Sequence, residues 1–142
     1  MAELPNIIRE KSVGCLCTVD ETGSPSGATV FYAIKNEKLY IISHKGSQKV
    51  KSIQQNHKVC LVVADDVEYK QAQLYAIAKI IDNPDMYMPL LEEVFSKHAK
   101  DNDTLVPYMY INDEGGPVMI ELTPQKNVHF STDGGLVEQK LN

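Results

Sequence analysis

The residues best suited to chemistry lie in a short connection between an apolar run and a helical segment. This connection, residues 43–49, contains Ser43, Ser47 and Lys49, and Gly46 permits a tight turn before Ser47. Ser47 is a good helix N-cap, and the N–H groups that follow a cap have no partner within the helix. Such N–H groups, the helix dipole and lysine amines together suit a bound phosphate. The same pattern fits a solvated connection with its lysines in water, so both interpretations stay open.

Positive charge is concentrated at this connection. The chain has 142 residues and a formal charge of −5, whereas Lys45, Lys49 and Lys51 fall within seven residues. No basic face elsewhere is strong enough to supply the phosphate contacts of a nucleic-acid complex. We therefore expect no nucleic-acid partner.

The elements that must position the connection are short strands. Residues 39–42 are apolar, aromatic and β-branched, as in a buried strand, and residues 47–56 have the spacing of a helix of two to three turns. A short opening helix is predicted over 5–11, and another helix begins at Asn83, with a kink or break at Pro89. Strands are predicted at 13–20, 26–35, 38–43, 58–64, 71–82, 105–111 and 117–131. This spacing favours a mainly β fold, either a barrel or a sandwich.

The length fits a single domain. Residues 132–142 contain two glycines and little apolar content, which predicts a loose tail after a domain of residues 1–131. No apolar signal region follows Met1 and no run is long enough to span a membrane. We expect a soluble, cytoplasmic protein with no membrane partner.

Three cysteines, an odd number, do not suggest a disulfide framework. Cys15 and Cys17 lie two apart in one predicted strand and therefore point to one face, while Cys60 lies in another strand. No second Cys or His pair has the spacing of a metal site. We expect three buried, reduced thiols that pack as small hydrophobic side chains, and no metal.

The order of motifs along the chain resembles a known family. These motifs are Gly14, Thr18-Val19-Asp20, Gly23-Ser24-Pro25 and Ser43-x3-Ser47-Gln48-Lys49-x3-Ile53-x2-Asn56-x2-Val59. They resemble the pyridoxamine 5′-phosphate oxidase-like, FMN-binding split-barrel family over residues 13–81, and more weakly to Phe130. The resemblance implies a split β-barrel of six to eight mostly antiparallel strands with two to three peripheral helices. It also implies a homodimer with FMN at the interface, touched by both chains.

The resemblance further implies which residues contact FMN. Ser43, Ser47, Gln48 and Lys49 would hold the phosphate and ribityl chain, and Thr29, Val30 and Phe31 would line the isoalloxazine ring. Gln71, 22 residues after Lys49, matches a glutamine that contacts FMN in the oxidases. Relatives carry Arg where this chain has Gln48, and a neutral amide should hold phosphate less tightly than a guanidinium fork.

Oxidation of pyridoxamine phosphate itself is not expected. The true oxidases hold that substrate with a C-terminal segment rich in Arg and containing Trp, whereas this chain has no Trp and its only arginine is Arg9. The expectation is an FMN-dependent oxidoreductase with an unknown small-molecule electron donor or acceptor and no identified catalytic residue. The alternatives are a non-catalytic flavin carrier or sensor, and a haem-binding protein that uses His98 or His129 as axial ligand.

Overall fold

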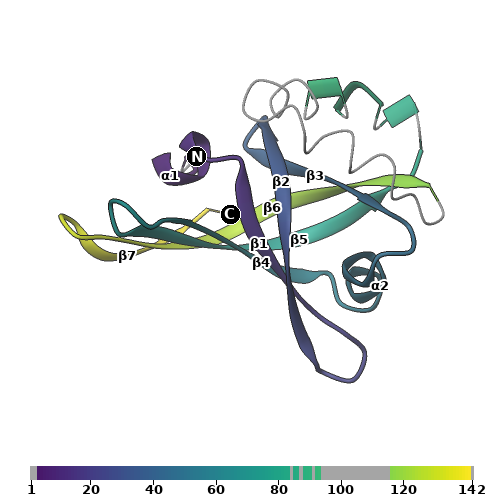
Figure 1. The fold of residues 1–142 in the computed structure, drawn as a ribbon, viewed down its shortest axis with the longest axis horizontal. Coiled ribbons are helices and arrows are strands. Elements are labelled where there is room, and N and C mark those ends of the chain that lie inside the picture. Colours follow the sequence, from purple (N-terminus) through teal and green to yellow (C-terminus); the bar gives the residue numbers. More distant parts are fainter. Residues whose placement is uncertain (1–2, 84, 87, 91, 94–115, 142) are drawn as a thin grey trace.

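Six antiparallel strands close into a barrel, and a seventh extends its sheet (Figure 1). The computed structural model describes residues 3–83, 85–86, 88–90, 92–93 and 116–141. Its strands are β1 (Val13–Val19), β2 (Pro25–Lys35), β3 (Lys38–His44), β4 (Lys58–Asp65), β5 (Lys70–Ile81), β6 (Pro117–Ser131) and β7 (Gly135–Lys140). The order is β3-β2-β1-β4-β5-β6-β7, and a further pairing of β3 with β6 closes the ring. The predicted mainly β, split-barrel class is confirmed.

Short helices lie at the margin of the barrel. The first is α1 (Asn6–Glu10), the second is α2 (Gln48–Gln55), and residues 85–86, 88–90 and 92–93 are also helical. The helices predicted over 5–11 and 47–56 are confirmed, whereas the strand predicted at 105–111 lies outside the described residues. Within the described part of the chain, no helix has the length and apolar character needed to cross a membrane.

Alternation along the strands fills the barrel with apolar side chains. Buried residues of six strands and both labelled helices form one cluster, which includes Leu16, Val30, Leu39, Leu61, Leu74, Ile120, Ile7, Ile8, Val50 and Ile53. Successive strand residues point to opposite faces, so each buried residue has neighbours that face outward. The barrel interior is therefore a packed core, and ligand chemistry must take place at its surface or at a break between strands.

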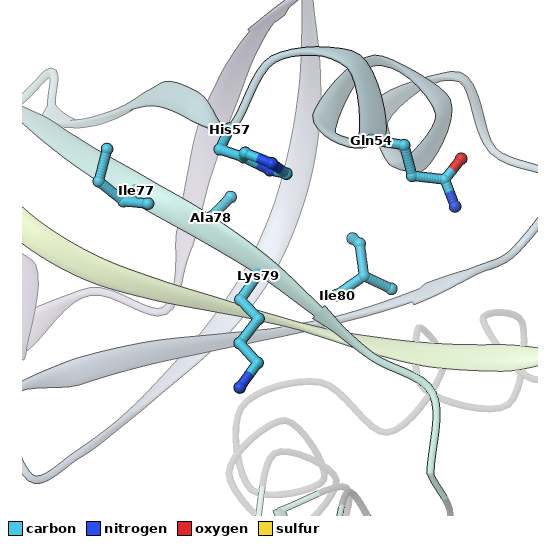
Figure 2. Close-up of a pocket in the computed structure, with 6 residues that line it drawn as sticks. All are labelled: Gln54, His57, Ile77, Ala78, Lys79 and Ile80. Carbon is cyan, nitrogen blue, oxygen red and sulfur yellow. The ribbon is translucent and has the colours of Figure 1, made fainter.

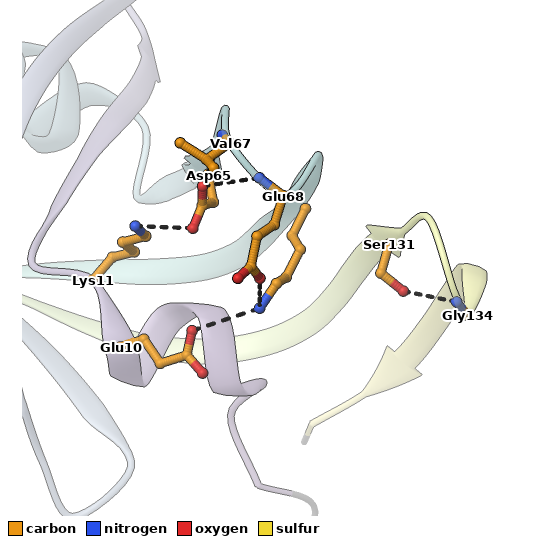
Figure 3. A network of polar contacts seen from close by, with 8 residues as sticks. Glu10, Lys11, Asp65, Val67, Glu68, Ser131 and Gly134 are labelled. Carbon is orange, nitrogen blue, oxygen red and sulfur yellow. Dashed lines mark hydrogen bonds and ion pairs between the residues drawn. The ribbon is translucent and has the colours of Figure 1, made fainter.

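Ion pairs hold α1 to the turn between β4 and β5 (Figure 3). The Nζ atom of Lys11 lies 3.1 Å from Oδ2 of Asp65. The Nζ atom of Lys70 lies 2.6 Å from Glu68 and 3.8 Å from Glu10. These groups are largely solvated, so each pair adds little stability.

The C-terminal segment differs from the predicted loose tail. Residues 135–140 form β7, which pairs antiparallel with β6 from Lys126 to Ser131. Beyond it, Leu141 is buried in the core and its N–H donates to the carbonyl oxygen of Gln125 at 2.8 Å. Gly135 has a φ of 67°, as a hairpin turn requires. Gly134 and Gly135 therefore belong to a hairpin turn between β6 and β7, and the prediction of a loose tail was wrong.

Candidate functional site

A break in strand pairing opens the barrel between β2 and β3. The two strands pair from Lys35↔Lys38 to Tyr32↔Ile41 and then separate. Beyond this point β2 pairs with β1 as far as Pro25, and β3 pairs with β6 as far as His44. We call the two diverging segments, residues 25–31 of β2 and 42–44 of β3, the split. The predicted contact residues Thr29, Val30, Phe31 and Ser43 all belong to it.

The β3 side of the split is joined to the start of α2 by two hydroxyl groups. The Oγ atoms of Ser43 and Ser47 lie 3.0 Å apart, and both residues are buried. Ser47 is the N-cap of α2, and its Oγ accepts from the N–H of Val50 at 3.4 Å. Next to them, Nδ1 of His44 is buried without a hydrogen-bond partner in the described structure. The cap predicted at Ser47 is therefore present, and beside it lies a buried ring nitrogen of His44 that has no hydrogen-bond partner in the described structure.

Lys49 provides an uncompensated positive charge at the same helix terminus. It is half-buried, and burial lowers the pKa of its amine. Among the residues that the structure describes, none forms an ion pair or a hydrogen bond with this amine. An ammonium group withdrawn from water without a counter-ion is unfavourable, and a bound anion would relieve that cost.

Gln48, predicted to stand where relatives have Arg, points along the helix. Its Nε2 donates to Oγ of Ser52 at 3.2 Å, one turn further on, and its side chain is exposed. This hydrogen bond directs the amide away from the Ser43–Ser47 pair. Gln48 is therefore adjacent to the candidate site in sequence but does not contribute a side-chain group to it in this conformation.

The three β2 residues contribute in different ways. Thr29 and Phe31 face outward, opposite Cys15 and Val13 of β1 respectively. Val30 points into the barrel core and is 3% exposed. Val30 can therefore offer a ligand only its backbone groups, whereas Thr29 and Phe31 can also offer side chains.

Gln71 is not brought together with these residues within one chain. It is exposed at the start of β5, opposite Ala64 and Phe130. The part of β5 that lines a pocket beside α2 is residues 77–80. Gln71 and Ile77 are six positions apart on this strand, a distance of roughly 20 Å. Within a single chain, Gln71 thus lies far along β5 from the residues that line the pocket beside α2.

A separate pocket lies between the C-terminal end of α2 and residues 77–80 of β5 (Figure 2). Its volume is about 460 Å³, and it is lined by Gln54, His57, Ile77, Ala78, Lys79 and Ile80. None of the predicted contact residues lines it. The helix extends about 12 Å from the Ser47 cap to this pocket. Sequence analysis did not identify these residues, because alternating apolar and polar positions on β5 give no signal beyond that of an ordinary strand.

Comparison with models of known protein families shows to which family the chain belongs. The family model described as pyridoxamine 5′-phosphate oxidase matches residues 1–127. The chain belongs to the pyridoxamine 5′-phosphate oxidase family. Membership of this oxidase family agrees with the motif order and with the barrel topology. A comparison with curated proteins gave no match.

Solved structures of low sequence identity share the fold of this family member. A protein related to general stress protein 26, of the pyridoxinephosphate oxidase family, from Clostridium acetobutylicum has a TM-score of 0.72 at 14% identity, covering 96% of this chain and 90% of that chain. A pyridoxamine 5′-phosphate oxidase-related, FMN-binding protein from Nostoc punctiforme gives 0.66 at 14%, covering 92% and 87%. A heme binding protein from Mycobacterium smegmatis gives 0.70 at 13%, covering 94% of this chain but 55% of that chain. At these low identities, the similarities establish only that this chain has the fold of the oxidase family.

Proposed function

We propose that this protein binds FMN at the split and is an FMN-dependent oxidoreductase. The observation that carries the proposal is the half-buried amine of Lys49, which lacks a counter-ion in the described structure and lies two residues after the Ser47 cap. Helix N-termini with free N–H groups are ready-made phosphate sites. The family of the chain and its FMN-binding structural neighbour support a flavin as the ligand that carries this phosphate.

Different groups of the chain would bind the phosphate and the isoalloxazine ring of FMN. Lys49, Ser47 and Ser43 would hold the phosphate, through one ammonium and two hydroxyl groups. The backbone of residues 29–31 would lie along the isoalloxazine ring, because β2 has left its pairing with β3 there. Bound FMN supplies two-electron transfer, while the protein supplies position and electrostatics. Pyridoxamine phosphate is not proposed as the substrate, since Arg9 is the only arginine and lies near the start of the chain.

A homodimer would account for the remote position of Gln71. One protomer presents Gln71 roughly 20 Å along β5 from the part that faces α2. A two-fold interface places the same patch of each chain against its partner, so Gln71 can approach the FMN of the other protomer. We therefore include a homodimer with FMN at the interface, and a small-molecule electron donor or acceptor, in the proposal.

The absorption spectrum of freshly purified protein tests this proposal against its alternatives. A flavin spectrum that a reduced nicotinamide bleaches supports the oxidoreductase, and a flavin inert to electron donors supports a carrier or sensor. A Soret band would support haem and overturn the FMN assignment. In the described structure, Nδ1 of His129 is hydrogen-bonded to Nδ2 of Asn127 at 2.7 Å, and His98 lies outside the described residues. No feature of the described residues favours the haem alternative over FMN.

A further inference from the structure

Three free thiols form a cluster on the outer face of β1 and β4. Cys15 and Cys17 lie on β1, and Cys60 lies directly opposite Cys17 on β4. Leu16, between the first two, is fully buried in the barrel, so its neighbours face outward. All three cysteines are partly exposed, which corrects the expectation of thiols buried as core side chains. We call Cys15, Cys17 and Cys60 the thiol cluster.

A glycine on the neighbouring strand makes room for the cluster. Gly27 of β2 lies opposite Cys17. A Cβ atom added to Gly27 would lie 2.9 Å from Sγ of Cys15 and 4.0 Å from Sγ of Cys17. The Cys15 sulfur therefore occupies the space that a side chain at position 27 would fill, and the Cys17 sulfur lies at van der Waals distance from it. The side chains of Cys15 and Cys17 therefore lie against the same glycine, and Cys60 stands opposite Cys17 on β4.

The strand geometry selects which two thiols can be joined. Directly opposite residues of antiparallel strands have Cα atoms about 4.5–5.5 Å apart, within the range that a disulfide spans. Cys15 and Cys17 lie two residues apart on one strand, or about 6.6 Å, near the limit of that range. We propose that Cys17 and Cys60 form a reversible cross-strand disulfide by exchange with a low-molecular-weight disulfide, while Cys15 stays reduced.

The exchange balances without any group from the proposed flavin site. One protein thiolate attacks the small disulfide, forms a mixed disulfide and releases one small thiol. The second protein thiolate then attacks the protein sulfur of the mixed disulfide and releases the other small thiol. Cys17 and Cys60 together lose two electrons and two protons, and the small disulfide gains both as two thiols.

The surroundings of the thiols set the pH at which exchange is fast. Burial is the main cause that raises the pKa of Cys60, to about 11, and it also raises the pKa of Cys17. Only the thiolate attacks, so the rate rises about tenfold per pH unit while the thiolate is the minor form. Exchange should therefore be slow at pH 7 and about thirtyfold faster at pH 8.5.

The test is incubation of the native protein with oxidised glutathione at pH 8.5, followed by alkylation and mass spectrometry. We expect the number of free thiols to fall from three to one, and dithiothreitol to restore all three. Trypsin should release a linked pair of peptides, residues 12–35 joined to residues 59–70. Retention of all three thiols, or a disulfide between two chains, would overturn the proposal.

Serine variants decide which β1 thiol is used, because Cys15 and Cys17 fall in the same tryptic peptide. Cys15→Ser should keep the linked peptides and retain no free thiol. Cys17→Ser and Cys60→Ser should both lose the link. A link that survives Cys17→Ser but not Cys15→Ser would overturn the pairing. If Cys17→Ser does not fold, the Cys15→Ser variant alone still shows whether Cys17 is the partner of Cys60, because it retains the link only in that case.

Discussion

The hydroxyl oxygens of Ser43 and Ser47 lie 3.0 Å apart and thereby join the end of β3 to the cap of α2. Because Oγ of Ser47 also accepts from the N–H of Val50, the connection is already ordered without a ligand. A phosphate that enters such a site finds its donors in place and pays little for ordering them. The arrangement is what a preformed anion site requires.

Replacing Lys49 with Ala should weaken FMN binding roughly ten- to a hundred-fold, because a charge-assisted hydrogen bond contributes about 1.5–3 kcal/mol. Riboflavin, which has no phosphate, should bind the variant and the wild type equally. Lys51→Ala, an exposed lysine of the same helix, is the matched control and should change neither affinity. Fluorescence titration measures all six affinities. Equal losses for FMN and riboflavin would move Lys49 away from the phosphate.

Gln48→Arg should tighten FMN binding and steepen its dependence on salt. An arginine would add a guanidinium fork near the phosphate and release the hydrogen bond to Ser52. Since position 48 is exposed, the gain should be at most about fivefold at low ionic strength and should vanish in high salt. Titration at two salt concentrations measures it. An unchanged affinity at low salt would mean that position 48 faces solvent in the complex as well.

The protein should sediment as a dimer of twice the 15.9 kDa chain mass. FMN should raise the thermal midpoint of that dimer, because a ligand held by both chains stabilises the assembly. Gln71→Ala should reduce the increase. A monomer that binds FMN with full affinity would rule out the shared site, although the barrel itself would stand.

Gly14→Ala should lower the free energy of unfolding by about 1–3 kcal/mol through overpacking. A Cβ atom at position 14 would lie 2.9 Å from the carbonyl oxygen of Val62, a backbone atom that cannot rotate away. Gly27→Ala is the control, because its nearest neighbour is the Sγ atom of Cys15, which can move. Urea denaturation measures both variants, and a larger loss for Gly27→Ala would contradict the argument.

Glu37 should make the attachment of α1 dependent on pH. Its carboxylate forms an ion pair with Arg9 and accepts the N–H of Leu4 at 3.1 Å. The hydrogen bond from Arg9, followed by that from Leu4, lowers the pKa of Glu37 below its ordinary value of 4.5. The stabilisation is therefore fully present above pH 4.5 and is lost as the pH falls through the lower, folded-state value. The thermal midpoint of the wild type should exceed that of Glu37→Gln at pH 6, and the difference should shrink steadily as the pH falls below 4.5. A constant difference across this range would exclude the linkage.

Local signals in the sequence were sufficient for β1 to β6 and the cap at Ser47, because each depends on residues close together in the chain. They left a barrel and a sandwich open, and the split barrel followed from the family resemblance. The burial of Val30 follows from the same two-residue alternation that makes Thr29 and Phe31 face outward. The split could not be predicted from local signals, because it depends on β3 pairing with β6, a strand more than 70 residues later, beyond the point where its pairing with β2 ends. For the same reason, residue spacing could not place Gln71 relative to Lys49. The strand at Gly135–Lys140 was missed because the glycines before it are equally typical of a flexible end.

The double pairing of β3 also has a consequence for synthesis on the ribosome. Residues 39–44 pair with residues 117–122, so the ring cannot close until β6 has emerged from the exit tunnel. Until then β3 has no partner on its β6 side, and β5, which also pairs with β6, has none along that edge. Open strand edges of this kind template association between chains. Nascent chains of this protein should therefore depend on holding chaperones until the residues of β6 have been added.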